Sequence, residues 1–220
     1  AMIDGTPPVW PIGMTRVAAN ASDGRQAVRD AAAEGYEIIK AYEKLDLDTF
    51  LAICDEANEL NLKVIGHLPQ NGKGLTERFF VPGFGMVAHA EEIAQQTNPP
   101  TVDAISDYAR WAKRSGTWLT STLTADHRIL EAMLQPETLQ TRPEIRYLEA
   151  HVQRMARHAN PYVRDTSPER IAYVRRIVDF NNKLVTVFAR EGIPIVAGTD
   201  ALARAAHAGT VFRVGCRRAG

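Results

Sequence analysis

The chain has 220 residues, 45% of them hydrophobic and 24% charged, which are ordinary proportions for a globular protein. Its 26 Lys and Arg residues balance 26 Asp and Glu residues, so the formal net charge is zero. This balance argues against a nucleic-acid or anionic-membrane partner, because such surfaces select a basic excess. The two cysteines, Cys54 and Cys216, lie far apart in the sequence, and we expect no disulfide.

The sequence carries no membrane or export signal. It contains no apolar run of eighteen residues, so we expect no transmembrane helix. The first residues, "AMIDGTPPVWPIG", lack the basic start and apolar core of a signal peptide. They are typical of a loop, and we therefore expect the chain to begin inside a longer protein. The cellular location stays open, with the cytoplasm as the default.

Helical and strand patterns alternate along the first half of the chain. After a loop or partial strand over residues 1–22, "SDGRQAVRDAAAEG" predicts a helix capped at Ser22 or Asp23 and ended at Gly35. "LDTFLAICDEANELN" predicts a second helix whose apolar stripe runs from Leu47 to Leu60. "TVDAISDYARWAKRSG" predicts another helix. Five apolar runs between and after the helices predict strands: "YEIIKAY", "LKVIGHL", "GFGMVAHA", "TWLTSTL" and "IPIVAGTDA".

The second half is mainly helical. Residues 125–168 predict a helical excursion broken at three prolines, which we interpret as a cover or lid between two strands. A long helix follows, capped either by Ser167, with Pro168 at its first position, or by Thr166, with Glu169 at capping-box spacing. Strands separated by helices predict parallel pairing with both faces covered. The fold class is therefore α/β. After residue 201 a basic tail over 202–220 shows no clear helical stripe.

Four ionisable residues occupy the same place on four of the predicted strands. Lys40, His67, His89 and Asp200 each lie at a carboxyl end, and the first intervals of 27 and 22 residues are each close to one βα repeat. In a βα barrel this place is the rim where active sites are built. Taken singly, each residue also has a purely structural interpretation. Either histidine could be hydrogen-bonded in the core or at the rim, Lys40 could extend its ammonium into solvent, and Asp200 could cap the next helix. Together they predict a site for a divalent metal, since histidine and carboxylate are its usual ligands.

The motifs "EIIKAY", "VIGHLP", "MVAHAEE" and "IPIVAGTDA" resemble those of the metal-dependent amidohydrolase superfamily, in the branch of imidazolonepropionase and prolidase-like enzymes. The resemblance covers residues 23–201 and implies a partial (β/α)8 TIM-type barrel. It implies that Lys40 is carboxylated and bridges two metals, that His67 and His89 bind the more exposed metal, and that Asp200 binds the buried metal and shuttles protons. Tyr42 lies two residues beyond Lys40, so we expect it on the same face, in contact with substrate.

The chain departs from the family pattern in two ways. No His-x-His pair occurs anywhere in the sequence, although the family carries one on its first strand, so we expect the N-terminal strands to be missing. The small β-sandwich of the family is missing too, and the end of the chain is atypical. Lys40, His67 and His89 still form the complete ligand set of one metal, and three ligands with one open position are usual for catalytic zinc.

The sequence therefore predicts a metal-dependent hydrolase of amides, cyclic amides, related C–N bonds or esters, acting on a small-molecule substrate. Zinc is the expected cofactor, at one or two sites, and other divalent metals are alternatives. Two other functions stay open: a non-catalytic barrel fragment that binds at most one metal, and a metal-dependent phosphoesterase. The second is weaker because no Gly-rich phosphate loop lies near the rim positions. An open barrel exposes strand edges, so we also expect a homo-oligomer that covers them.

Overall fold

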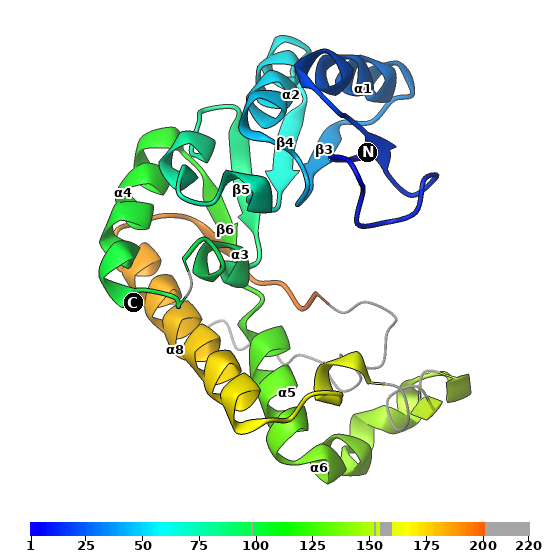
Figure 1. The fold of residues 1–220 in the computed structure, drawn as a ribbon, viewed down its shortest axis with the longest axis vertical. Helices are drawn as coiled ribbons and strands as arrows, with labels where there is room; N and C mark the ends of the chain where they lie inside the picture. Colours follow the sequence, from blue (N-terminus) through cyan, green and yellow to red (C-terminus); the bar gives the residue numbers. More distant parts are fainter. Residues whose placement is uncertain (98, 152, 155–159, 201–220) are drawn as a thin grey trace, which may run out of the picture. The chain divides into compact units, whose positions relative to one another are not determined.

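The computed structural model describes the whole chain except residues 98, 152, 155–159 and 201–220 (Figure 1). The predicted tail over 202–220 therefore lies outside the described residues. Contacts divide the chain into two compact units, which are described separately. The first comprises Ala1–Ser121 and Asp179–Gly198, and the second comprises Thr122–Val178 and Thr199–Gly220.

The first unit is built on a parallel sheet of seven strands in the order β2-β1-β3-β4-β5-β6-β7. All five predicted strands are present, and their parallel pairing is confirmed. Two short strands precede them in a stretch where the sequence predicts a loop or partial strand. Within the described chain the sheet ends at β2 and β7, and closure into a barrel stays a prediction. The strand bounds are β1 (Met2–Asp4), β2 (Arg16–Val17), β3 (Ile38–Ala41), β4 (Lys63–Gly66), β5 (Phe84–Ala88), β6 (Trp118–Thr120) and β7 (Ile195–Val196).

The two faces of the sheet differ in burial. Side chains alternate between faces along a strand, so Ile39 and Ala41 point one way and Lys40 the other. The first face is fully buried, with Ile39, Ala41, Val64 and Leu119 at 0% exposure. The second carries the register row Lys40–Ile65–Met86–Trp118, and Trp118 is 49% exposed. Coverage of this second, less buried face therefore stays a prediction.

Helices follow the strands at the predicted places. α1 (Ala21–Ala33) begins at Asn20, whose side chain accepts a hydrogen bond from the Asp23 N–H, so the predicted caps at Ser22 and Asp23 are wrong. The true cap was missed because Ser, Asp and Asn are equally good caps and three of them adjoin here. The bounds of the other helices of this unit are α2 (Leu47–Glu59), α3 (Ala90–Ala94) and α4 (Ile105–Ser115), with short 3₁₀ turns η1 (Gln70–Gly72), η2 (Thr76–Phe79) and η3 (Val102–Ala104).

α1 and α2 pack side by side (Figure 1). The predicted stripe of α2 is largely confirmed, because Phe50, Cys54 and Ala57 are almost fully buried. Leu60 is the exception: it is half exposed because the helix ends at Glu59, one residue earlier. Apart from α1, α2 also contacts β4, the strand that follows it in the chain.

The second unit contains α5 (Leu123–Leu134), α6 (Pro136–Thr141), η4 (Pro143–Tyr147), η5 (Pro161–Val163) and the first part of α8 (Pro168–Arg190). Each of the three predicted break points, Pro136, Pro143 and Pro161, is the first residue of a new element. Proline fits there because it lacks only an N–H that the first turn leaves unpaired. The cap of α8 is settled in favour of Ser167, whose Oγ accepts a hydrogen bond of 3.3 Å from the Arg170 N–H.

None of the described helices is long and apolar enough to cross a membrane.

Candidate metal centre

Three of the predicted site residues lie directly after consecutive parallel strands. Tyr42 follows β3, His67 follows β4, and His89 follows β5. The backbone N–H groups of both histidines extend the sheet pairing by one residue: His67 donates to the Ala41 carbonyl and His89 to the Thr120 carbonyl, each at 3.0 Å. Because the carboxyl ends of parallel strands share one edge, these side chains meet at the same edge of the sheet.

Gly66 allows His67 its position. Its φ of +137° lies in a region that L-residues rarely adopt, and a Cβ there would stand 2.1 Å from the Ala41 carbonyl oxygen. Only glycine permits this approach of β4 to β3. The dipeptide Gly66–His67 therefore combines a backbone that needs glycine with the side chain that the site uses.

The predicted side chains form a continuous row of neighbours. The Lys40 Nζ lies 5.2 Å from the centre of the Tyr42 ring, and this ring lies 4.2 Å from that of His67. The rings of His67 and His89 are 5.1 Å apart and nearly perpendicular, at 86°. His67 and His89 are both buried. The structure thus brings together four of the five residues that the sequence singles out.

Tyr42 is tied to the N-terminal loop. Its hydroxyl accepts a hydrogen bond of 2.8 Å from the Trp10 Nε1. Burial raises the pKa of Tyr42 to about 12, against the opposing effect of the Trp10 hydrogen bond, so the phenol is neutral at physiological pH. The hydroxyl holds the loop in place, and the ring face is the part of Tyr42 that lies against His67.

Two glutamates that the sequence interpretation missed flank His67. The His67 Nδ1 lies 2.9 Å from Glu92 Oε1 and 3.6 Å from Glu43 Oε1. Glu92 is buried, whereas the side chain of Glu43 is 29% exposed. Burial lowers the pKa of His67, but Glu43 and Glu92 together outweigh it and raise the pKa to about 9. The same contact with His67 is the main reason that the pKa of Glu43 lies below its usual value.

The positions of these glutamates explain why they were missed. Glu92 lies three residues after His89, on the first turn of α3, so a helical rather than a strand spacing places it beside the histidines. Glu43 lies beyond the end of β3, where the alternation that pairs Lys40 with Tyr42 no longer applies. The only available signal was the acidic pair after His89 in "AHAEE".

The His67 imidazole fits a metal ligand. Neither ring nitrogen makes an aligned hydrogen bond within the described chain, because the Nδ1–H direction does not point along the 2.9 Å contact with Glu92. An unpartnered buried polar atom costs about 1–3 kcal/mol, and a bound ligand at either ring nitrogen would offset this cost. One ligand atom each from Glu43, His67 and Glu92 lie within 4.8 Å of one another. Nitrogen and carboxylate oxygen donors suit zinc and other divalent ions.

The backbone is strained where the last three strands end. His89, Thr122 and Asp200 have φ values of +76°, +42° and +46°, in the left-handed region that favours glycine. A non-glycine residue held there costs on the order of 1 kcal/mol or more, and such residues cluster at functional sites. Asp200, four residues after β7, belongs by its contacts to the second unit.

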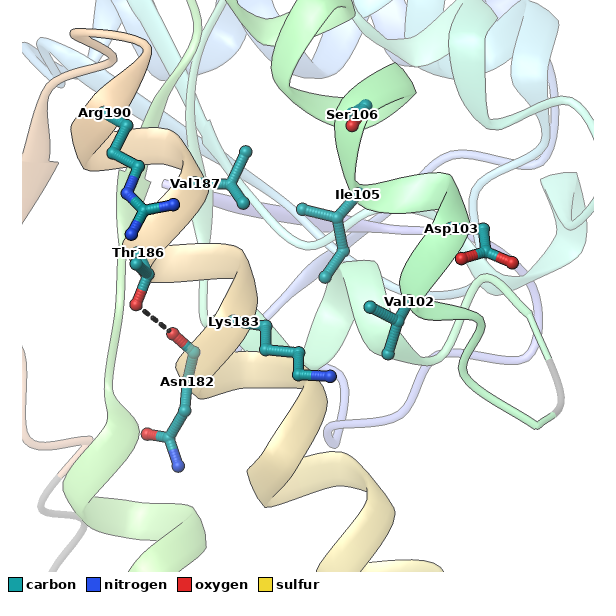
Figure 2. A pocket seen from close by; sticks show the side chains of 9 residues that line it. All are labelled: Val102, Asp103, Ile105, Ser106, Asn182, Lys183, Thr186, Val187 and Arg190. Atoms are coloured by element: carbon teal, nitrogen blue, oxygen red, sulfur yellow. Dashed lines mark hydrogen bonds between the residues drawn. The ribbon is translucent and has the colours of Figure 1, made fainter.

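The first unit also has a groove of about 530 Å³ between η3–α4 and α8, and none of the predicted site residues lines it. Figure 2 shows Lys183 and Arg190 on α8, with Asp103 and Ser106 on the facing segment. The Thr186 hydroxyl donates to the Asn182 carbonyl within α8, which leaves it engaged by its own helix. The groove is open, its two cations are exposed, and its one acidic residue, Asp103, is exposed as well.

A comparison with protein-family models gives no match, and neither does a comparison with curated proteins. Solved structures do match. The chain is 20% identical to a bottromycin amidohydrolase, with a TM-score of 0.64 over 95% of this chain and 47% of that one. It is 15% identical to the ochratoxinase of A. niger, with a TM-score of 0.55 over 90% of this chain and 39% of that one. At these identities the likeness shows a shared fold, and the chain spans about half or less of the length of these enzymes.

Proposed function

We propose that this chain belongs to a metal-dependent hydrolase of the amidohydrolase kind, which cleaves an amide, a cyclic amide, a related C–N bond or an ester. The observation that carries the proposal is the buried His67 ring, whose nitrogens have no hydrogen-bond partner, beside His89 and the two carboxylates. The shared fold with two hydrolases supports it. Zinc is the expected ion, because imidazole and carboxylate donors suit it.

Lys40, His67 and His89 would hold the metal. An ammonium at Lys40 would repel a divalent cation, so Lys40 would act as a carbamate. In that modification the neutral amine of Lys40 attacks carbon dioxide, an N–C bond forms, and one proton leaves to solvent. The carbamate then offers an anionic oxygen from the face of β3 that Ile39 and Ala41 do not use.

The bound metal would supply an activated water nucleophile and polarise the scissile carbonyl. Asp200 would accept a proton from that water and deliver it to the leaving nitrogen or oxygen. Tyr42 would orient substrate through its ring face, since Trp10 occupies its hydroxyl. Each of these roles comes from side chains that follow a strand end, which is where βα folds place their chemistry.

A non-catalytic module that binds at most one metal is the second candidate. The observation in its favour is that the sheet of the described chain ends at β2 and β7 and that the chain spans about half of its structural neighbours. Metal binding without turnover of amide, cyclic amide and ester substrates would support this candidate over the hydrolase.

The test is the zinc content of the purified chain by elemental mass spectrometry, before and after chelation. We expect about one zinc per chain and a hydrolytic activity that disappears with the metal and returns with it. His67→Ala should remove metal and activity together. His151→Ala is the matched control, because His151 is an exposed histidine paired with Glu149 in the second unit. Turnover by a metal-free His67→Ala protein would refute the proposal.

We also propose that the chain forms a homo-oligomer through the outer strands of the sheet or its less buried face. Unpaired backbone groups on an edge strand favour association, and Ile38 and Trp118 are about half exposed on that face. Sedimentation over a hundredfold concentration range tests this proposal. A monomer at every concentration would contradict it.

A further inference from the structure

We propose that the loop between β1 and β2, residues 5–15, sets the substrate specificity of the metal centre. Its apolar side chains contact an uncharged aliphatic or aromatic group of the substrate. This inference deepens the proposed function and rests on it, because it names the kind of substrate that the hydrolase would accept. It follows from the place of the β1–β2 loop beside Tyr42, from the way the loop is held, and from the exposure of its side chains.

The β1–β2 loop begins at the edge of the sheet where the site residues lie. β1 pairs with β3 in parallel, with Ile3 opposite Ala41, so the loop leaves β1 beside the point where Tyr42 leaves β3. The Trp10 Nε1–H donates a hydrogen bond of 2.8 Å to the Tyr42 hydroxyl. The centre of the Tyr42 ring lies 4.2 Å from that of His67. One side chain therefore joins Trp10 to the buried histidine, and a substrate at the metal centre would meet the loop on the side of Tyr42.

The base of the β1–β2 loop is fixed by a buried carboxylate. Asp4, the last residue of β1, is fully buried, and its carboxylate accepts hydrogen bonds from three backbone N–H groups. Two of them belong to the loop, Gly5 at 2.9 Å and Val9 at 2.8 Å. The third belongs to Lys44, beyond the end of β3, at 2.7 Å. A loop that is held before the substrate arrives loses little conformational freedom on binding, so more of its contact energy appears as affinity.

The apolar side chains of the β1–β2 loop are exposed. Val9, Ile12 and Met14 are 43%, 84% and 63% exposed, and Trp10 is partly exposed. All four lie within six consecutive residues, and none of residues 5–15 is charged, although 24% of the whole chain is. A single exposed apolar side chain needs no explanation, but several together beside a functional site indicate a binding surface. This surface favours an apolar group, because a charged group would lose its hydration there without gaining a partner.

The first experiment titrates the metal-free chain with three amides that differ only in their side chains: N-acetyl-leucinamide, N-acetyl-glycinamide and the α-amide of N-acetyl-glutamic acid. Methyl NMR of a chain with ¹³C-labelled isoleucine reports contact with Ile12, whose signal is identified by its absence in Ile12→Val. We expect the leucine amide to bind about 10–100-fold more tightly than the glycine amide, because a buried leucine side chain contributes that much. We expect the glutamic acid amide to bind no better than the glycine amide. Equal affinities for leucine and glycine, or an unshifted Ile12 methyl signal, would overturn the inference.

The same titration tests whether the probe lies at the metal centre. The ring-proton signals of His67, identified by their absence in His67→Asn, should shift at the same concentrations of the leucine amide as the Ile12 methyl signal. A shift at Ile12 alone would mean that the loop binds the probe away from the histidine, and would overturn its role in the specificity of the metal centre.

A pair of variants tests the contribution of the loop itself. Ile12→Ser should weaken binding of the leucine amide about tenfold, because one apolar contact is lost. Val102→Ser is the matched control: Val102 is 41% exposed and lines the groove that contains none of the predicted site residues. It should leave the affinity unchanged. A loss of affinity in Val102→Ser but not in Ile12→Ser would place the probe in that groove and overturn the inference.

A second copy of the chain is the alternative occupant of this apolar surface. If the loop were the contact between copies, Ile12→Ser would lower the oligomeric mass in sedimentation and leave the ratio of the leucine and glycine affinities unchanged. That combination would overturn the inference. We expect the opposite combination, with the ratio lowered and the mass unchanged.

Failure of this inference is distinguishable from failure of the proposed function. A chain that binds about one zinc but does not discriminate between the leucine and glycine amides would overturn the inference alone. A chain that discriminates between them but binds no zinc would overturn the metal-dependent hydrolase, and with it the role of the loop in hydrolase specificity. The loop would then be a surface that binds apolar groups without a part in catalysis.

Discussion

Glu56 and Glu92 are both almost fully buried, at 4% and 2% exposure, but they have different partners. Glu56, on α2, accepts two hydrogen bonds from Arg29 on α1, at 2.7 and 3.1 Å, and lies 3.4 Å from Arg25. The Arg29 hydrogen bond is the main reason that the pKa of Glu56 lies below its usual value. Both partners of Glu56 are permanently charged, so this pair joins two helices and changes little with pH.

Glu92 instead faces a group that can lose its proton. The His67 Nδ1 lies 2.9 Å from its Oε1, and neither nitrogen of that ring has a hydrogen-bond partner within the described chain. A buried carboxylate that faces guanidinium is complete, whereas one that faces an imidazole with an open nitrogen can exchange a proton for a metal ion. Burial alone therefore does not distinguish an acid that joins two helices from one that lies beside a titratable histidine; the partner does.

The largest expected effect is that of Gly66→Ala. This change tests whether the strand ends around His67 are as rigid as the packed helices α1 and α2. The new Cβ would meet the Ala41 carbonyl oxygen at 2.1 Å, in a backbone with φ of +137°. We expect the free energy of unfolding to fall by at least about 3 kcal/mol, with loss of zinc binding. Denaturant unfolding measures this change.

Gly35→Ala is the matched control for Gly66→Ala. Gly35 follows α1 with φ of +86°, and a Cβ there would meet nothing within 4 Å. We expect the unfolding free energy to fall by about 1 kcal/mol, from backbone strain alone. Equal losses at the two positions would show that the contact with Ala41 is not what sets the geometry of His67.

The second prediction concerns the pH dependence of the metal-free protein. The folded pKa of His67, about 9, is higher than the value of 6.5 expected in the unfolded chain. Its contribution to stability is therefore fully present below pH 6.5 and is lost as the pH rises through about 9. The loss amounts to up to roughly 3 kcal/mol. Chemical unfolding at several pH values between 6 and 10 measures it.

The control for this pH series is Glu92→Gln. Its stability should depend clearly less on pH, because one of the two carboxylates that raise the pKa of His67 is gone. The comparison is needed because burial also raises the pKa of the Cys54 thiol, so Cys54 lowers stability in the same direction above about pH 8.5. Cys54 is common to both proteins, and its effect cancels in their difference. A parallel pH profile in the two proteins would contradict the electrostatic account of His67.

The same contrast shows what the sequence could predict. Lys40, His67 and His89 were found because each occupies the end of a strand, and strand ends of parallel sheets converge. Glu92 was missed because a helical turn carries it to the site, and Glu43 because it follows the end of its strand. β1 and β2 were missed because they have three and two residues, too few for an alternating pattern to appear.

The third prediction is Glu56→Gln, which should lower the unfolding free energy by about 1–2 kcal/mol. The change leaves Arg29 without its charged acceptor, and the effect is moderated because the Arg29 side chain is 53% exposed. Zinc affinity should not change. Thermal unfolding and chelator competition measure the two quantities. A fall in zinc affinity with Glu56→Gln would break the division between a structural and a functional glutamate.

The smallest expected effect is that of Arg25→Ala. Arg25 lies 3.4 Å from Glu56 and 3.3 Å from the mostly exposed Asp55. It does not form the bidentate pair with Glu56 that Arg29 forms. We expect a loss of about 0.5 kcal/mol for Arg25→Ala and a larger loss for Arg29→Ala. Both arginines face the same carboxylate and carry the same charge. The ratio of the two losses in unfolding free energy therefore reports the effect of hydrogen-bond geometry. Equal losses would mean that Glu56 responds only to the total positive charge around it, and that the geometry of its partners is irrelevant at the helix pair.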